Sequence, residues 1–199
     1  MKPPPWVWPQ GLVFWAVYVW AFFPEFAIIR KGQQADRAAA TRSQDSRSMQ
    51  VIILGMWLGL LIAFPIAFQR RFAITGIARV VAYWGGTVLL FLGSLLRRHC
   101  WRVLGRYFTG NVQTVDQQPV IDTGAYAFVR HPSYTAGIMM FVGIGLALGN
   151  WLSVAVTFAS AAAVYAYRVR VEERALVSSL GLRYVEFMKT RKRFIPYLY

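Results

Sequence analysis

Five apolar stretches divide the chain, and each has the composition of a helix that lies in a membrane. They cover residues 11–29, 51–68, 74–96, 134–149 and 151–167. A helix rises about 1.5 Å per residue and the hydrocarbon core of a bilayer is about 30 Å thick, so the first three stretches can span it. The last two are shorter and meet at Gly149 and Asn150, which favour a tight turn. The pattern predicts an all-α, integral membrane helical bundle of about five transmembrane helices, the last two being short spans or a tight hairpin.

Composition agrees with a membrane protein and excludes two other classes. Of the 199 residues, 57% are hydrophobic and only 15% are charged. A soluble domain has about 25% charged residues, and a disordered chain lacks the apolar and aromatic residues that are abundant here. The length predicts a single domain.

The positive charge of the chain is concentrated in three segments. Lys and Arg number 22 against 8 Asp and Glu, which gives a formal net charge of +14. Eighteen of the 22 lie in residues 30–50, 97–133 and 168–199, which face one side of the membrane if there are five spans. Because basic loops stay in the cytoplasm, we expect the N-terminus outside and the C-terminus inside. In a soluble protein such charge would indicate nucleic acid, but basic loops explain it here, so we expect no nucleic-acid partner. No cleavable signal peptide is evident.

Few residues could carry chemistry inside the membrane. Glu25 and Arg79 are ionisable residues within apolar stretches, and because each lies near the end of its stretch we expect its side chain to reach the interface. Cys100 is the single cysteine, so an intramolecular disulfide is excluded, and the two histidines add little toward a metal site. We therefore expect the polar chemistry in residues 97–133 and 168–199, which closure of the hairpin would bring together.

One candidate site lies at the start of the hairpin, where Arg130, His131 and Pro132 precede Tyr134. This order places a cation, a titratable imidazole and free backbone N–H groups at the membrane interface, and helix N-termini attract anionic groups such as a carboxylate. The same residues could equally cap the span and contact lipid headgroups. Both interpretations stay open on the pattern alone.

A second candidate site follows the last apolar stretch, where Glu172 and Glu173 stand in a strongly basic tail. Arg168 and Glu172 are four residues apart on one helix face, so an ordinary ion pair is the simplest explanation. Apolar residues recur at helical spacing between residues 169 and 185, interrupted by Gly181, as in an amphipathic helix at the interface. These features alone indicate a polar cytoplasmic site for a zwitterionic or anionic molecule.

Several short motifs occur in order across the second half of the chain. They are Leu104-Gly105-Arg106-Tyr107-Phe108, Gly124-x-Tyr126, Arg130-His131-Pro132-Ser133-Tyr134, Glu172-Glu173, Gly181-x-x-Tyr184-x-x-Phe187 and Ile195-Pro196. Together they resemble the isoprenylcysteine carboxyl methyltransferase family of integral membrane enzymes, which is related to the phospholipid N-methyltransferases. The resemblance implies a methyltransferase core in residues 97–199, including the hairpin 134–167. Residues 1–96 would form three N-terminal transmembrane helices with a basic cytoplasmic loop.

The resemblance implies S-adenosylmethionine as the methyl donor and S-adenosylhomocysteine as its product, in a cytoplasmic cofactor site between the segment before the hairpin and the C-terminal helix. The residues at the family's cofactor positions are Gln113, Gln118, Pro119, Val120, Ile121, Tyr126, His131, Pro132, Ser133, Tyr134 and Glu172. Among them, Glu172 would receive the amino group of the cofactor. Arg168, Glu173 and Arg130 are the candidate catalytic residues, with Arg168 facing the carboxylate of the acceptor.

The chemistry of these residue types suits the assignment. A glutamate complements the amino group of the donor, while an imidazole and helix-start N–H groups complement its carboxylate. Methyl transfer to an ionised carboxylate needs alignment and desolvation but no general base. An amine acceptor would need a base, for which only Glu173 and His131 are candidates. We therefore expect a lipophilic acceptor that carries a carboxylate, such as a prenylated cysteine, in contact with membrane lipids.

Three other functions stay open on the sequence. The protein could N-methylate a phospholipid headgroup or methylate another small hydrophobic acceptor, although phospholipid N-methyltransferases usually have fewer spans. It could be a non-catalytic membrane scaffold, in which case methyl transfer from S-adenosylmethionine would be absent. A membrane reductase of the sterol type would be stabilised by NADPH and not by S-adenosylmethionine.

Overall fold

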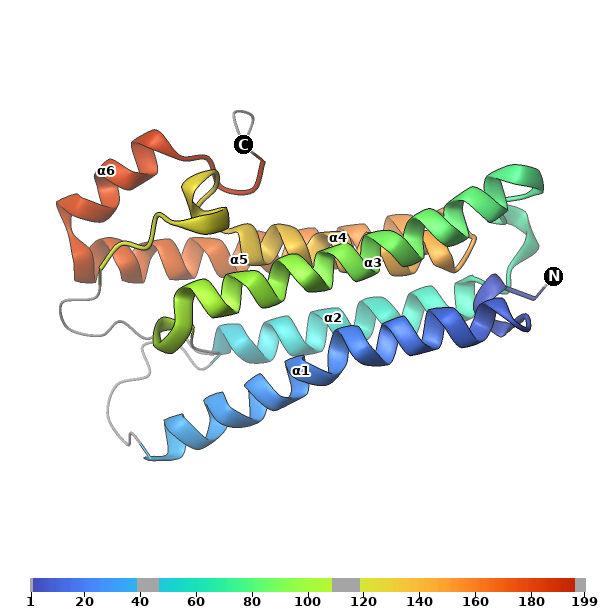
Figure 1. Cartoon of the computed structure of the whole chain (residues 1–199), viewed down its shortest axis with the longest axis horizontal. Helices are drawn as coiled ribbons and strands as arrows, with labels where there is room; N and C mark the ends of the chain where they lie inside the picture. The colour runs from blue at the N-terminus through green and yellow to red at the C-terminus, as the bar shows by residue number, and fades with distance from the viewer. Residues whose placement is uncertain (1, 39–46, 109–118, 196–199) are drawn as a thin grey trace.

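The structure, a computed structural model, describes residues 2–38, 47–108 and 119–195. Within these described residues, five long helices run along a common direction and form a bundle, and a short sixth helix folds back at one end (Figure 1). The helices are α1 (Gln10–Ala38), α2 (Arg47–Ile66), α3 (Gly76–Leu104), α4 (Pro132–Ala147), α5 (Trp151–Leu180) and α6 (Leu182–Thr190). Short 3₁₀ turns lie at η1 (Pro4–Trp6), η2 (Arg70–Phe72), η3 (Gly105–Tyr107) and η4 (Gly124–Ala127). The predicted all-α class is confirmed.

The outside of the bundle is apolar where a soluble protein would be polar. Leu54, Leu61, Ile77 and Val81 are 61%, 63%, 79% and 64% exposed. Among the described residues, three helices (α2, α3 and α5) are long and apolar enough to cross a membrane by length and composition, whereas α4 is shorter. Apolar side chains exposed along helices of this length require lipid around them. The protein is therefore an integral membrane protein.

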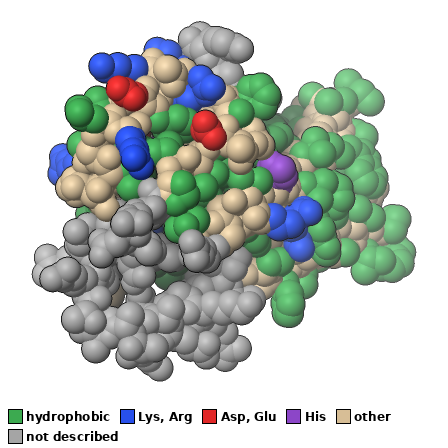
Figure 2. Space-filling model, turned by 60° about the vertical axis from the view of Figure 1, so that its left-hand side comes forward, with side chains coloured by type: hydrophobic (Ala, Val, Ile, Leu, Met, Phe, Trp, Pro, Cys, Tyr) green, Lys and Arg blue, Asp and Glu red, His purple; other side chains and the backbone are tan. Residues whose placement is uncertain are grey.

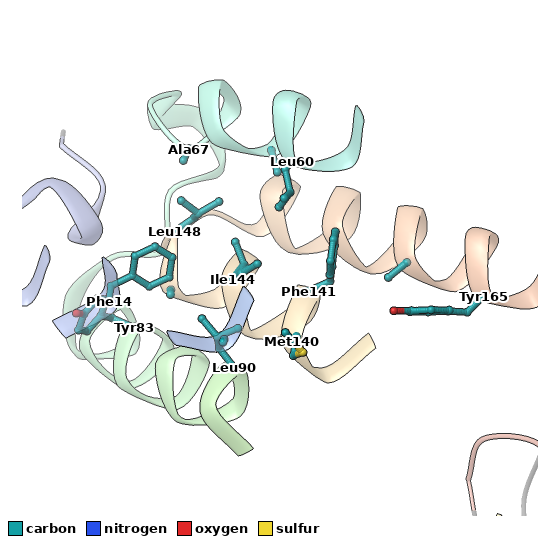
Figure 3. Packing of buried hydrophobic residues seen from close by; sticks show 14 residues of the cluster. Phe14, Leu60, Ala67, Tyr83, Leu90, Met140, Phe141, Ile144, Leu148 and Tyr165 are labelled. Carbon is teal, nitrogen blue, oxygen red and sulfur yellow. The ribbon is translucent and has the colours of Figure 1, made fainter. Parts of the chain in front are cut away.

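Helix α4 lies between α3 and α5 and organises the core. It approaches α3 closely because both helices have a glycine where they cross. A Cβ atom on Gly86 would lie 2.5 Å from the carbonyl oxygen of Gly143, and one on Gly143 would lie 2.6 Å from that of Gly86. Small residues allow such contact between membrane helices. The buried side chains of Leu90, Met140 and Ile144 pack beside this crossing (Figure 3).

The turn predicted between α4 and α5 is confirmed at Gly149 and Asn150. Gly149 has a φ of +69°, which glycine adopts at no steric cost. Asn150 is fully buried, and its Oδ1 accepts two N–H groups from the first turn of α5, at 3.0 and 3.2 Å. Its Nδ2 donates to the carbonyl oxygens of Ile66 and Gln69, at 3.2 and 3.0 Å. The Asn150 side chain thus caps α5 and hydrogen-bonds the turn to the end of α2.

Two helices continue further than the apolar stretches that predicted them. Helix α3 runs past residue 96 and ends before Gly105, whose φ is +53°. Helix α5 runs past residue 167, and Gly181, with a φ of +59°, separates it from α6. A change to polar residues shows where a helix leaves the hydrocarbon of the membrane. The helix itself ends further on, at a glycine that adopts a positive φ. The predicted C-terminal amphipathic segment is consequently the end of α5 followed by α6.

The described parts of the two polar segments, residues 97–133 and 168–199, lie at the same end of the bundle. The end of α3, the start of α4, the end of α5 and the whole of α6 gather on the left of Figure 1, whereas the N-terminus and the α4–α5 turn lie at the other end. Figure 2 turns this left-hand end forward and shows Lys, Arg, Asp and Glu side chains on it, with hydrophobic side chains covering the bundle behind. The charged groups of the chain are therefore concentrated where the two polar segments meet.

Candidate functional site

Two extended pieces of chain, one before α4 and one after α6, run side by side. The backbone N–H of Arg130 donates to the carbonyl oxygen of Lys192 at 2.8 Å, and that of His131 donates to the carbonyl oxygen of Arg193 at 3.0 Å. The polar segment that follows the hairpin is thereby held against the segment that precedes it. This is the juxtaposition that the sequence predicted.

Glu173 of α5 stands at the centre of the contact and is 5% exposed. Its carboxylate oxygens lie 3.0 Å from Arg130 Nη2, 2.8 Å from Arg193 Nη2 and 3.2 Å from His131 Nε2. Two guanidinium groups compensate the charge of the buried carboxylate, which would otherwise be costly to take out of water. The oxygens of Glu173 are thus engaged in fixing Arg130 and His131.

Tyr134, in the first turn of α4, links Glu172 and Arg168, two further charged residues of the site. Its hydroxyl donates to the Glu172 carboxylate and accepts from Arg168 Nε at 3.4 Å. Its ring stacks between two others, with centroid separations of 5.5 Å to His131 and 4.9 Å to Tyr165. Stacking and hydrogen bonding together fix the ring, so Glu172 and Arg168 are held around a single hydroxyl.

Two further tyrosines outside the spanning segments are neutral hydrogen-bonding groups. Burial raises the pKa of Tyr126, in η4, and the nearby Cys100 and Glu172 raise that pKa further. Burial also raises the pKa of Tyr184, in α6, and the carboxylates of Glu172 and Glu173 act in the same direction. Both hydroxyls therefore keep their protons at neutral pH.

A cavity of about 330 Å³ opens among these groups, within the size range of small-molecule sites. Its polar end is lined by Arg130, His131, Ser133, Tyr134, Arg168 and Glu172. Its apolar arm, as we call the part beside α2, is lined by Ile52, Ile53, Met56, Trp57, Leu60 and Phe141. A molecule with a charged head and a hydrocarbon tail could place each in matching surroundings.

The structure brings together most of the residues that the sequence predicted for the site. Those that line the cavity are Pro119, Val120, Ile121, Tyr126, Arg130, His131, Ser133, Tyr134, Arg168 and Glu172. Pro132 is buried at the first position of α4 and is not among the lining residues. Glu173 borders a second, more open hollow beside Arg170, Arg174 and Arg193. Gln113 and Gln118 lie outside the described residues.

An ion pair that the sequence patterns did not reveal lies in the cavity wall. Glu25 of α1 and Arg97 of α3 both line the cavity, and Arg97 Nη2 lies 3.0 Å from Glu25 Oε2. The side chain of Glu25 is 17% exposed and is paired with Arg97. That it reaches the membrane interface stays a prediction. Arg79 is partly buried, and its guanidinium donates to the carbonyl oxygen of Lys2. The sequence shows each ionisable residue at the end of an apolar stretch, but it does not show that the two residues pair.

Fold and site together define a class, that of helical integral membrane proteins whose cavity joins a charged end at the helix termini to an apolar arm between helices. Residues 86–178 match the model of the Isoprenylcysteine carboxyl methyltransferase (ICMT) family. The family resemblance indicated by the motifs is thereby confirmed.

Three curated relatives illustrate the similarity. Protein-S-isoprenylcysteine O-methyltransferase B of Arabidopsis thaliana is 29% identical over 116 residues, covering 57% of this chain and 58% of that protein. The Protein-S-isoprenylcysteine O-methyltransferase of Saccharomyces cerevisiae is 29% identical over 115 residues, with coverages of 57% and 48%. Its namesake from Schizosaccharomyces pombe is 30% identical over 109 residues, with coverages of 54% and 46%. The chain spans about half the length of these relatives.

A solved structure of the eukaryotic intramembrane Ras methyltransferase ICMT shares the fold. The match has a TM-score of 0.64 at 21% identity and covers 98% of this chain and 70% of that chain. The likeness therefore includes the first three helices, which lie mostly before the residues that match the family model.

Proposed function

We propose that this protein is an integral membrane, S-adenosylmethionine-dependent methyltransferase that esterifies the carboxylate of a lipid-tailed acceptor, with a prenylated cysteine as the first candidate. The observation that carries the proposal is that one cavity holds both parts of the site, with Glu172 and Arg168 meeting at Tyr134 beside an apolar arm. The relatives named above are Protein-S-isoprenylcysteine O-methyltransferases, which supports the same reaction.

The polar end of the cavity fits the methyl donor. S-adenosylmethionine carries an ammonium and a carboxylate on its methionine portion, and when bound it supplies an activated methyl group on a sulfonium. Glu172, oriented by the Tyr134 hydroxyl, is the carboxylate that would hold the ammonium. His131 and Ser133 offer polar atoms at the start of α4, where the helix dipole favours a carboxylate. Tyr126 and the segment 119–121 would cover the adenosine.

Arg168 is the residue proposed to hold the acceptor. It is 3% exposed, lines the cavity and donates to the Tyr134 hydroxyl, so its guanidinium is held in place before an acceptor arrives. The acceptor carboxylate is ionised at neutral pH and is already a nucleophile. The protein then needs only to align it and to exclude water, for which the apolar arm is suited.

The surroundings of Glu173 favour an oxygen acceptor over an amine. An amine must lose a proton during methylation, and Glu173 was a candidate base. Its carboxylate is instead engaged by Arg130, His131 and Arg193 and is not among the residues that line the cavity. His131, the other candidate base, is itself engaged at Nε2 by Glu173. We therefore assign Glu173 and Arg130 to positioning His131, and we assign no base to the reaction.

The proposal extends to topology and to the division of the chain. We place the N-terminus outside and the C-terminus and the site in the cytoplasm, because 18 of 22 basic residues fall in the segments at the site end. We assign residues 97–199 to the methyltransferase core. Residues 1–96 supply three helices, of which α1 and α2 contribute lining residues to the apolar arm and its neighbourhood.

The proposal is tested by offering the purified full chain, in lipid nanodiscs, labelled S-adenosylmethionine with a panel of acceptors. The panel contains a prenylcysteine, its methyl ester as the blocked control, a fatty acid and phosphatidylethanolamine. We expect label on the prenylcysteine as a methyl ester that base releases as methanol, and none on the blocked control. Base-stable label on phosphatidylethanolamine, or no transfer to any acceptor, would contradict the proposal.

A further inference from the structure

The ion pair between Glu25 and Arg97 lies in the wall of the proposed catalytic cavity and has no role in the mechanism so far. Both oxygens of the Glu25 carboxylate are engaged, one by Arg97 Nε and the other by Nη2 at 3.0 Å. The two side chains are 17% and 15% exposed. A two-point contact of this kind between planar groups fixes the orientation of the guanidinium as well as its position.

The remaining nitrogen of the same guanidinium reaches the donor site. Arg97 Nη1 donates to the carbonyl oxygen of Ser133 at 3.0 Å and to its Oγ at 3.1 Å. Ser133 is 5% exposed, lines the polar end and stands between His131 and Tyr134 in the first turn of α4. A chain of charge-assisted hydrogen bonds therefore runs from α1, through α3, to the turn that carries the proposed donor contacts.

The next residue along α3 shows that tethering α1 to α3 does not require this pair. Arg98 donates to the carbonyl oxygen of Trp20 in α1, and its guanidinium lies 3.8 Å from the centroid of the Trp20 ring. Arg98 is not among the residues that line the cavity. Two adjacent arginines thus hold the same two helices together, but only Arg97 also contacts α4 and the cavity.

Glu25 also neutralises the positive charge of Arg97 in the cavity wall. A buried ion pair is weak evidence for stability, because desolvation offsets the attraction between its members. In the cavity wall, however, Glu25 compensates a cation that would otherwise face a methyl donor whose sulfonium is itself positive. S-adenosylhomocysteine, the demethylated product, has a neutral thioether at the same atom and would not feel that repulsion.

We propose that Glu25 and Arg97 are positioning residues of the methyl-donor site. Arg97 fixes the first turn of α4 through Ser133, and Glu25 both orients Arg97 and neutralises it. This inference rests on the proposed function and adds to it a role for α1, since Glu25 lies outside the residues that match the family model.

The test compares affinities for S-adenosylmethionine and S-adenosylhomocysteine by isothermal titration of the full chain in nanodiscs. Arg97→Gln is expected to weaken S-adenosylhomocysteine about tenfold, because Ser133 loses its anchor, and S-adenosylmethionine by less, because the uncompensated Glu25 carboxylate attracts its sulfonium. Glu25→Gln is expected to weaken S-adenosylmethionine about 3- to 10-fold more than S-adenosylhomocysteine, because Arg97 is left uncompensated. The double variant removes both charges, so the ratio of the two affinities should return to that of the wild type while both stay weak. Arg98→Gln is the matched control and should bind as the wild type does.

The outcomes separate the two proposals. If the wild type binds neither ligand, the proposed function fails. If the wild type binds both but Arg97→Gln and Glu25→Gln match Arg98→Gln in both affinities, the positioning role is wrong. If Arg97→Gln does not fold, Arg97→Lys decides, since it keeps the charge but cannot contact Glu25 and Ser133 with one planar group. An unchanged affinity in Arg97→Lys would overturn the role, and a loss for both ligands with an unchanged ratio would support it.

Discussion

Replacing Glu173 with glutamine removes one negative charge from among Arg130, His131 and Arg193 and keeps the shape of the side chain. The three partners respond differently because they differ in access to water. The side chain of Arg193 is 32% exposed and can turn outward, whereas those of Arg130 and His131 are 8% and 4% exposed. The variant therefore leaves at least one buried cation without its counter-ion.

Removing one member of a buried ion pair costs about 3–5 kcal/mol. Because Arg193 can recover its hydration, we expect Glu173→Gln to lower the free energy of unfolding by about 3 kcal/mol, the low end of that range. The affinity for S-adenosylhomocysteine should fall as well, since His131 loses the carboxylate that orients its ring.

The measurement is a denaturant titration of the full chain in mixed micelles, with the free energy of unfolding extrapolated to zero denaturant. Glu186→Gln is the control, because Glu186 is an exposed residue of α6 and belongs to no ion pair of the described residues. The control should stay within about 0.5 kcal/mol of the wild type. A Glu173→Gln variant as stable as the control would refute the view that this carboxylate holds the two polar segments together.

Three further substitutions test other parts of the site and the fold. Glu172→Ala should weaken cofactor binding by about 1.5–3 kcal/mol, the contribution of a hydrogen bond to a charged group, and an unchanged dissociation constant in titration calorimetry would remove Glu172 from its assigned role. Arg168→Ala should reduce turnover on acidic acceptors in the methyl-transfer assay while cofactor affinity is kept, and a parallel loss of both would make Arg168 structural. Asn150→Ala should lower the free energy of unfolding by about 2–4 kcal/mol, because a helix cap and two hydrogen bonds to α2 are lost, and a change below about 0.5 kcal/mol would show that the turn does not need them.

The sequence predicted those parts of the molecule that depend on local pattern. The apolar stretches predicted the helices of the bundle, and Gly149 with Asn150 predicted the turn between α4 and α5, since both residue types have conformational preferences of their own. The motifs from residue 104 onward predicted the match to the family model, because they combine residue types that recur at short, fixed spacings. The ends of α3 and α5 were not predicted, since a change to polar composition does not by itself interrupt helical hydrogen bonding.

Contacts between distant residues were beyond such patterns. Glu25 and Arg97 are 72 residues apart, and nothing in either apolar stretch specifies that the two helices pack with these faces together. The pairing of His131 with Glu173, rather than with Glu172, depends on how α5 is rotated about its axis. One residue along a helix changes direction by about 100°, so adjacent glutamates face different partners and carry different roles.

The most direct measurement is a structure of the full chain in nanodiscs with S-adenosylhomocysteine bound. We predict that the ligand lies between residues 131–134 and Glu172, with its amino group at the Glu172 carboxylate and the apolar arm left open for an acceptor. Ligand density in the hollow beside Arg170 and Arg174, or none near Tyr134 at a saturating concentration, would contradict the assignment of this cavity to methyl transfer.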